Sequence, residues 1–343
     1  NNIMFIKLIN QYLLLIIMVL FNSCSNDDYN PNLLKPKTKN NYGEILFGLE
    51  KKYWKSDLGK QIENSFERLI KTTPLPFEKE YEIDFVVPNK ILKNIKNNNC
   101  FVFIDIDKHH PNNIAPIIKQ NLWSRNQIII ELKFKSSDIA QQYFQKNANE
   151  LKSIIKDFNL KKIAERWSFQ NNISNELKGE NSLKFKASKK ITLNKKNKNF
   201  WWWSQLEIQK DQNGSHEIQK GIIIYQSPYI NKNQFQKNNI LKCRDSIGQK
   251  FLLGKKNNSY MVTSKNGINE ITDSSFYINN KYVKKVNGCW RMQNDKMGGP
   301  FVSYSWLNHN KTKIITAEGY VYAPNFEKLK YLRELESTIV SGI

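Results

Sequence analysis

The apolar positions in the first half of the chain alternate between strand-like runs and helical spacing. Ser56 is placed as the N-cap of one helix, and Ser136 or Ser137 as the N-cap of a much longer one. A short helix is also expected between the last two strands. The expected strands cover residues 43–49, 81–87, 100–106 and 126–134, and the three helical faces hold Leu58, Ile62, Phe66, Leu69 and Ile70, then Ile114, Ile117, Ile118 and Leu122, then Ala140, Phe144, Leu151, Ile154, Ile155 and Phe158.

The second half is richer in strands. A polar stretch at residues 171–181 separates it from the first half. Pro324 marks the start of a terminal helix, because proline is favoured in the first helical turn. The expected strands lie near residues 183–193, 200–209, 217–225, 259–263, 281–292, 300–306 and 313–322, and the stripe of the terminal helix holds Phe326, Leu329, Leu332, Leu335 and Ile339.

This order of elements predicts an α+β protein with two lobes, at residues 43–170 and 182–343, each a mostly antiparallel sheet packed by helices. Both halves begin with strand, loop and helix and end with strand, turn and helix. A diverged internal duplication is therefore one interpretation, although the sequence shows no residue-level repeat. Hydrophobic residues make up 40% of the chain, which is enough apolar side chains to form a core.

An apolar leader precedes the first lobe. Lys7 supplies a positive charge, residues 12–21 are unbroken apolar, and Asn22 and Ser23 lead to Cys24. The apolar run is shorter than the roughly 20 residues that a membrane-spanning helix needs. We therefore expect residues 1–23 to be a cleaved signal peptide and Cys24 to be the lipid attachment point. An ordinary signal peptide with an unmodified Cys24, or a retained apolar start, are the alternatives.

Residues 21–24, Phe-Asn-Ser-Cys, resemble the lipobox of bacterial lipoproteins at the last two positions and depart from it at the first two. Bacteroidetes lipoproteins tolerate such loose boxes. Asp27 and Asp28 are similar to the short acidic tag that sends some of these proteins to the outer face of the outer membrane, and a periplasm-facing anchor is the alternative. Residues 24–42 are rich in Asn, Pro and Lys and are expected to form a flexible tether.

The chain carries a formal charge of +22, with 53 basic and 31 acidic residues. Six arginines leave 47 lysines among the 53 basic residues. Arginine is the residue favoured for bidentate contacts to phosphates and bases, so this composition indicates a solvated lysine shell. We expect no nucleic-acid partner, and expect instead the membrane, through the lipid, and an envelope protein or a surface glycan.

The sequence contains no recognisable catalytic signature. GxSxG, HExxH, P-loop and paired CxxC motifs are absent, and acidic residues do not cluster at metal spacing. Cys100, Cys243 and Cys289 can form at most one disulfide, and no histidine lies near them in sequence. No catalytic residue, metal ligand or cofactor is therefore predicted, and a non-enzyme is favoured. Carboxylates assembled only by folding remain an alternative, namely Asp105, Asp107, Glu131 and Glu318.

Four motifs near the C-terminus carry a family resemblance: Gly-Cys-Trp at 288–290, Met-Gly-Gly-Pro-Phe-Val-Ser at 297–303, Glu-Gly-Tyr-Val-Tyr-Ala-Pro at 318–324 and Leu-Arg-Glu-Leu-Glu at 332–336. In this order they resemble the Bacteroidetes lipoprotein family known as domain of unknown function 4837. The resemblance extends over residues 43–341 and implies a location and a domain extent, but no activity. Weaker motifs are Leu75-Pro76 with Glu78, Trp123 with Gln127, Phe200 with Trp202, and residues 259–261.

Two features within these motifs are candidate ligand sites. Gly298, Gly299 and Pro300 predict a tight turn with positive φ, whose amides have the alternative role of an anion-binding nest. Glu318 is expected on the solvent face of a half-buried strand, with a shielded carboxylate near that turn as the alternative.

A run of four aromatic residues at positions 200–203 is the third candidate. On a strand, Trp201 and Trp203 point one way and Phe200 and Trp202 the other, so one pair can be core and the other can stack on sugars. A strand covered on both faces gives the same pattern. The leading hypothesis is a non-catalytic binding or interaction protein at the outer membrane. A glycan- or peptide-acting hydrolase that uses assembled carboxylates and a glycan-binding module that uses the tryptophans are the alternatives.

Overall fold

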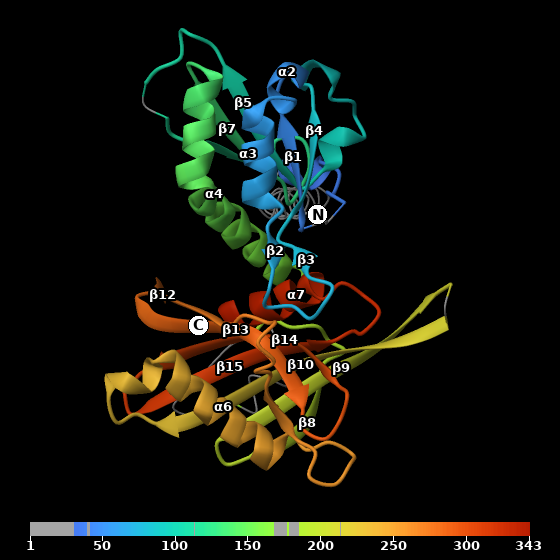
Figure 1. The fold of residues 1–343 in the computed structure, drawn as a ribbon, viewed down its shortest axis with the longest axis vertical. Coiled ribbons are helices and arrows are strands. Elements are labelled where there is room, and N and C mark those ends of the chain that lie inside the picture. The colour runs from blue at the N-terminus through green and yellow to red at the C-terminus, as the bar shows by residue number, and fades with distance from the viewer. Residues whose placement is uncertain (1–30, 40–41, 113, 168–176, 178–184, 213) are drawn as a thin grey trace, which may run out of the picture.

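A computed structural model describes residues 31–39, 42–112, 114–167, 177, 185–212 and 214–343. Two lobes, each built on its own β-sheet, lie one above the other (Figure 1). The predicted signal peptide and Cys24 lie outside the described residues, as do the first part of the predicted tether and nearly all of the polar stretch at 171–181.

The first lobe contains a five-stranded sheet in the order β4-β1-β5-β7-β6. The pairs β1–β4, β1–β5 and β5–β7 are parallel, and only β6 runs antiparallel to its neighbour. The prediction of a mostly antiparallel sheet is therefore wrong for this lobe. The parallel pair β1–β4 arises because helices lie between these strands in sequence and carry the chain back across the sheet. The strands are β1 (Glu44–Gly48), β4 (Glu82–Val86), β5 (Cys100–Ile106), β6 (Ile117–Gln120) and β7 (Ile128–Phe134).

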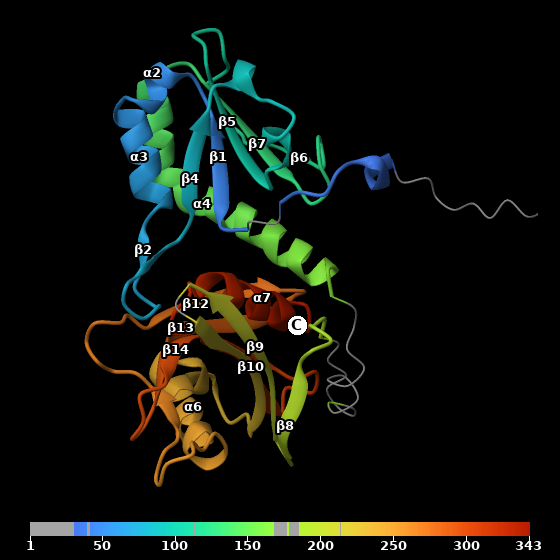
Figure 2. The same cartoon turned by 90° about the vertical axis from the view of Figure 1, so that its right-hand side faces the viewer.

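Three helices, α2 (Lys51–Trp54), α3 (Asp57–Phe66) and α4 (Ser137–Glu165), cover one face of this sheet (Figure 2). The predicted N-caps are confirmed, since Ser56 Oγ accepts from Leu58 N and Ser136 Oγ accepts from Ile139 N. The core between sheet and helices is aromatic, with Phe47, Phe66 and Phe144 in mutual ring contact.

The helix expected at residues 114–122 is wrong, because residues 117–120 form β6. Asn121 and Asn126 adopt left-handed backbone conformations, with φ of 54° and 63°, and turn the chain into a β6–β7 hairpin. Ile117 and Ile118 are 44% exposed at the edge of the sheet, so their apolar spacing does not reflect burial on a helix.

Leu69 and Ile70 were expected on the face of α3, but this helix ends at Phe66. These two residues form β2 (Leu69–Ile70), which pairs with β3 (Glu78–Lys79) in a small hairpin directed toward the second lobe (Figure 1). We call residues 69–79 the hairpin arm.

The hairpin arm is docked on the second lobe by hydrogen bonds at several points. Asn269 Nδ2 donates to the Thr73 carbonyl at 2.6 Å, and Cys289 Sγ donates to the Thr72 carbonyl at 3.3 Å. The carboxylate of Glu78 accepts from the backbone amides of Lys328 and Leu329, at 2.7 and 2.8 Å, at the start of the last helix. Because these contacts come from both lobes, they help fix the lobes relative to each other.

The second lobe contains an eight-stranded antiparallel sheet in the order β11-β13-β14-β15-β10-β9-β8, with β12 also paired to β13. Here the antiparallel prediction is correct. The strands are β8 (Thr192–Asn197), β9 (Phe200–Asp211), β10 (Gly214–Pro228), β11 (Met261–Thr263), β12 (Thr272–Ile278), β13 (Lys281–Met292), β14 (Gly298–Leu307) and β15 (Lys313–Tyr322).

Helix α6 (Lys237–Phe251) covers one face of this sheet, and α7 (Leu329–Val340) covers the other face, between the sheet and the first lobe (Figure 1). Trp203, Trp306 and Ile339 belong to the core on the α7 side, and Trp290 and Phe301 to the core on the α6 side. Short 3-10 helices are η1 (Pro31–Leu34), η2 (Pro88–Lys90), η3 (Ile95–Asn97) and η4 (Lys232–Phe235).

The α+β class is thus confirmed, whereas the sequence pattern missed α6 and β12 and placed the start of α7 too early, at Pro324. A largely parallel sheet in one lobe and an antiparallel sheet in the other have different topologies, so the lobes are not two copies of one fold. Within the described ranges, no helix has both the length and the apolar character required to cross a membrane.

Candidate functional site

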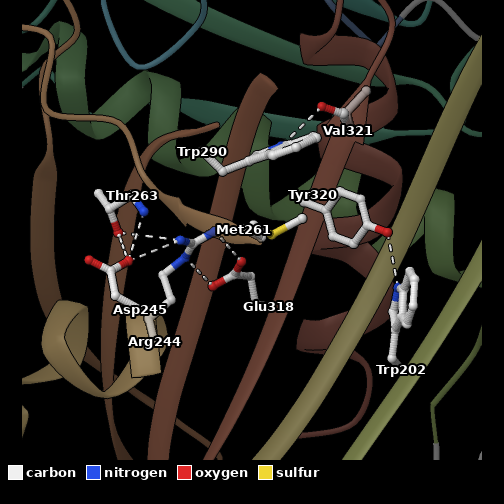
Figure 3. A network of polar contacts seen from close by, with 9 residues as sticks. All are labelled: Trp202, Arg244, Asp245, Met261, Thr263, Trp290, Glu318, Tyr320 and Val321. Carbon is white, nitrogen blue, oxygen red and sulfur yellow. Dashed lines mark hydrogen bonds and ion pairs between the residues drawn. The ribbon is translucent and has the colours of Figure 1, made fainter. Parts of the chain in front are cut away.

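The aromatic run at 200–203 lies on β9, and both of its faces are covered. Trp201 and Trp203 are 7% and 1% exposed in the core beneath α7, and Phe200 is buried beneath α6. Trp202 is partly buried, and its Nε1 donates to the hydroxyl of Tyr320 at 3.0 Å (Figure 3). These rings are therefore structural, and the interpretation of a displayed pair that stacks on sugars does not hold.

Gly298 and Gly299 begin strand β14, so the predicted tight turn is wrong. They pair with Arg291 and Trp290, and neither has a positive φ. The residue in the left-handed conformation between β13 and β14 is Asn294, with φ of 58°. A strand at this position does not form an anion-binding nest.

Gly299 is required for packing. A Cβ at this position would lie 1.9 Å from the carbonyl oxygen of Val321. The same oxygen accepts a hydrogen bond of 3.2 Å from the indole Nε1 of Trp290. The glycine therefore leaves room for β15 and for the buried tryptophan.

Glu318 is buried at 1% exposure, so the expectation of a solvent-facing carboxylate is wrong. Its two oxygens accept from Nε and Nη2 of Arg244, at 2.9 and 2.8 Å (Figure 3). Arg244 comes from α6, is 4% exposed and lies 4.1 Å above the ring of Phe301. Asp245 accepts from the amide and hydroxyl of Thr263, which ties α6 to β11.

This buried pair is a structural element. Burial raises the pKa of Glu318, and the guanidinium of Arg244 opposes that shift. The adjacent cavity has a volume of about 10 Å³, which is room for about one water molecule. The pair joins α6 to β15 but offers no space for a ligand.

The remaining carboxylates named from the sequence do not assemble with Glu318. Asp105 lies 2.9 Å from Nε2 of His110, Asp107 accepts from the amide of His109, and Glu131 pairs with Lys119. All three carboxylates are in the first lobe. In the described ranges, the acidic, histidine and cysteine side chains form no group of three that could hold a metal ion.

The three cysteines are free thiols in unreactive surroundings. Burial raises the pKa of Cys100, of Cys243 and of Cys289, in the last case to about 12. Since the thiolate is the nucleophile, these side chains are poorly suited to nucleophilic catalysis.

The candidate site is a cleft between the two lobes, which the residue pattern along the chain did not indicate. It consists of two pockets of about 670 and 550 Å³, both in the size range of small-ligand sites. Glu80, Leu329 and Arg333 line both pockets, so the two are neighbours along the hairpin arm and the first turns of α7. We call the larger the acidic pocket and the smaller the basic pocket.

The acidic pocket is lined by seven glutamates and four basic residues, in a chain that is strongly basic overall. Several of these carboxylates have structural partners. Glu78 binds the first turn of α7, Glu80 pairs with Lys152 at 2.8 Å, and Glu334 pairs with Lys220 at 3.2 Å. The glutamates are Glu44, Glu67, Glu78, Glu80, Glu82, Glu327 and Glu334, and the basic residues are Lys79, Arg166, Lys330 and Arg333.

A cluster of four polar side chains from four elements of both lobes lies at the basic pocket, and three of the four, Lys156, Lys285 and Glu336, line it. Oε1 of Glu336, on α7, accepts from Nζ of Lys156 on α4 at 2.7 Å and from Nζ of Lys285 on β13 at 2.5 Å. The hydroxyl of Tyr304, on β14, donates to the same oxygen at 2.5 Å. Two ammonium groups thus share one buried carboxylate.

The electrostatics of this cluster are unusual. Burial opposes ionisation of Glu336, but Lys156 and Lys285 outweigh it and hold the pKa of Glu336 far below its usual range. Burial lowers the pKa of Lys285 to about 8, although Glu336 acts in the opposite direction. Lys156 is less enclosed, with 37% of its side chain exposed, and Glu336 raises its pKa against the effect of burial.

A signal for this cluster was present in the sequence. Glu336 lies beside Leu332, Leu335 and Ile339 on the buried stripe of α7, and Lys285 lies two positions after Val283 on a strand. Charged residues at core-facing positions are uncommon unless they are paired. The partners lie far apart in sequence, so the pattern alone could not bring them together.

The fold and this cleft define a two-lobed α+β protein with charged pockets between the lobes. Residues 170–341 match the profile of a domain of unknown function (DUF4837), and the chain belongs to this family, as the C-terminal motifs indicated.

Residues 40–168 match a second domain of unknown function (DUF8532). The resemblance to DUF4837 was therefore extended too far toward the N-terminus, and the motifs at Leu75, Glu78, Trp123 and Gln127 fall in the second match. In sequence, the boundary between the two matches follows α4 and precedes the first strand of the second lobe. No curated protein matches the chain.

Proposed function

We propose that the protein is a non-catalytic binding protein of the cell envelope, and that a ligand or a segment of a partner occupies the inter-lobe cleft. The observation that carries this proposal is the pair of adjoining, ligand-sized pockets lined by charged side chains from both lobes. Sites of this size between two lobes are typical of ligand binding.

Binding is favoured over catalysis because polar side chains of the cleft are already engaged in structural hydrogen bonds. Glu78 holds the start of α7, and Glu336 holds two lysines and a tyrosine. The thiols have raised pKa values. An envelope protein or a surface glycan is the expected class of partner.

The envelope location is proposed from the leader at residues 1–23 and from Cys24, with the lipid on that cysteine as the anchor in the outer membrane. Asp27 and Asp28 resemble the acidic tag of surface-facing lipoproteins, and a periplasm-facing anchor is the alternative. Mass spectrometry of the mature protein tests this location. We expect an N-terminal Cys24 that carries a diacylglyceryl group and fatty acid such as palmitate, and an unmodified N-terminus would overturn it.

The cleft is tested by photo-cross-linking in cells. A photoreactive amino acid replaces Lys330, which lines the acidic pocket, and in a matched control it replaces Lys255, an exposed lysine in the loop after α6. We expect a discrete adduct from position 330 only. If position 330 gave no adduct, or gave the same adduct as position 255, the cleft would not be the binding site.

A hydrolase acting on envelope glycan or peptide is a second candidate, and the seven glutamates of the acidic pocket are the observation that favours it. Glycoside hydrolysis uses two carboxyl groups roughly 5–10 Å apart. Glu82 and Glu327 are the residues to replace first by glutamine. Loss of a measurable hydrolytic activity in one of these variants would favour the hydrolase over the binding protein.

A further inference from the structure

The two lysines of the basic pocket have hydrogen-bond capacity left over. An ammonium group has three N–H donors. Among the hydrogen bonds of the described residues, Nζ of Lys156 and Nζ of Lys285 each donate once, in both cases to Oε1 of Glu336. Lys285 is only 8% exposed, so bulk water has little access to its remaining donors.

The pocket also has excess positive charge. Five basic and three acidic side chains line it. Glu336 is shared by two lysines, Glu80 pairs with Lys152 outside the lining, and Glu270 pairs with Lys71 at 3.1 Å. The basic residues are Arg68, Lys71, Lys156, Lys285 and Arg333, and the acidic residues are Glu80, Glu270 and Glu336.

Two ammonium groups bonded to one oxygen atom repel each other, and burial strengthens this repulsion because the local dielectric is low. A second anion beside them would relieve the repulsion and would use the free donors. Lysines act as compact point charges, so they suit any oxyanion without the planar geometry that arginine imposes.

From these observations we infer that the basic pocket binds an oxyanion group of the ligand, a phosphate, a sulfate or a carboxylate, through the ammonium groups of Lys156 and Lys285. This inference rests on the proposed function and specifies the ligand of the same cleft. The lowered pKa of Lys285 is consistent with it, because burial and the neighbouring charge of Lys156 both lower this pKa and Glu336 only partly offsets them.

Inorganic phosphate, sulfate and acetate are the probes. Binding to the full-length protein is measured by calorimetry at constant ionic strength, with chloride as the compensating salt, so that general screening is held fixed. The variants are Lys156→Gln and Lys285→Gln. The matched control is Lys284→Gln, which changes the neighbouring residue of β13, where the side chain pairs with Asp273 and does not line the pocket.

We expect saturable binding of at least one probe to the wild type and to Lys284→Gln, with affinity reduced at least tenfold in Lys156→Gln and in Lys285→Gln. Preference for phosphate or sulfate over acetate would identify a dianionic group, and the reverse preference a carboxylate. Lys156→Gln keeps the Lys285–Glu336 pair, so it stays informative even where Lys285→Gln folds poorly.

Equal responses of all four proteins would overturn the inference, and so would a wild type that binds none of the probes. An adduct at position 330 without oxyanion binding would refute the ligand class and leave the cleft as the binding site. Oxyanion binding without an adduct would refute the proposed function and leave the anion site.

Discussion

Replacing Glu336 by glutamine tests the cluster that joins the two lobes. The change keeps the shape of the side chain but removes the charge that Lys156 and Lys285 share. Removing one partner of a buried ion pair typically costs about 3–5 kcal/mol, because the other charge stays buried without compensation. Most of this destabilisation comes from Lys285, because this residue is only 8% exposed. The contribution of Lys156 is discounted, since its side chain is 37% exposed and can turn toward water.

We therefore expect Glu336→Gln to lower the free energy of unfolding by about 3 kcal/mol at pH 7. Urea denaturation followed by tryptophan fluorescence measures this quantity, with the slope of the transition as a check on the cooperativity of unfolding. The matched control is Glu327→Gln, an exposed glutamate just before α7, with an expected effect within about 0.5 kcal/mol.

A double variant separates loss of charge pairing from general disruption. Combining Glu336→Gln with Lys285→Met removes the uncompensated ammonium, and we expect it to recover at least about half of the lost stability. A loss below about 1 kcal/mol in the single variant, or no recovery in the double variant, would refute the reasoning.

Three further predictions concern the buried pair of Arg244 and Glu318, the packing of Gly299, and the protonation of Lys285. Arg244→Met should lower the free energy of unfolding by about 3–5 kcal/mol in the same assay, because it leaves the buried carboxylate of Glu318 unpaired. Adding Glu318→Leu should restore most of the lost stability, and additive losses in the double variant would contradict this. Gly299→Ala should lower the free energy of unfolding by at least about 2 kcal/mol, because its Cβ would overlap the Val321 carbonyl. Gly288→Ala should cost less stability, because the atom nearest to its Cβ lies at 3.1 Å. Equal losses would count against the packing role of Gly299. The pKa of Lys285 is about 8 in the folded protein, whereas an ordinary lysine has a pKa of 10.5. Between these two pH values the unfolded chain binds more protons than the folded protein does. The contribution of Lys285 to the free energy of unfolding therefore rises with pH across this window. Unfolding free energies of wild type minus Lys285→Gln should therefore increase by about 1.5 kcal/mol from pH 8 to pH 9.5, and a constant or falling difference would contradict the lowered pKa.

Two central strands of the second lobe were predicted well. Residues 313–322 were predicted with the bounds of β15, in which every residue from Ile314 to Val321 is buried. Residues 281–292 were predicted with the bounds of β13, although this strand also carries lysines, because apolar residues recur along it and are buried at Val283, Val286, Cys289, Trp290 and Met292. Ser56 and Ser136 were identified as N-caps for a local reason, since a cap bonds an amide two or three residues away.

Helix α6 was missed because its buried face is not simply apolar. That face contains Ile240 and Leu241, but also Arg244 and Gly248. An arginine at a buried position interrupts the periodicity on which the prediction depends. The error about Glu318 follows from this one, since its partner lies 74 residues earlier in the missed helix.

The cleft could not be predicted because its walls come from both lobes. Lys285 is one of 47 lysines, and only the docking of α4, α7 and the sheet brings it to Lys156 and Glu336. The parallel order in the first lobe is likewise a property of the crossover connections, which residue patterns along single strands do not specify.

The most direct test of the account is in-cell photo-cross-linking from the cleft, read out by mass spectrometry. We predict that a probe at position 330 captures an envelope protein or glycan, and that a probe at position 255 captures nothing comparable. Capture from position 255 alone, or from neither position, would contradict the claim that this protein works through the cleft between its lobes.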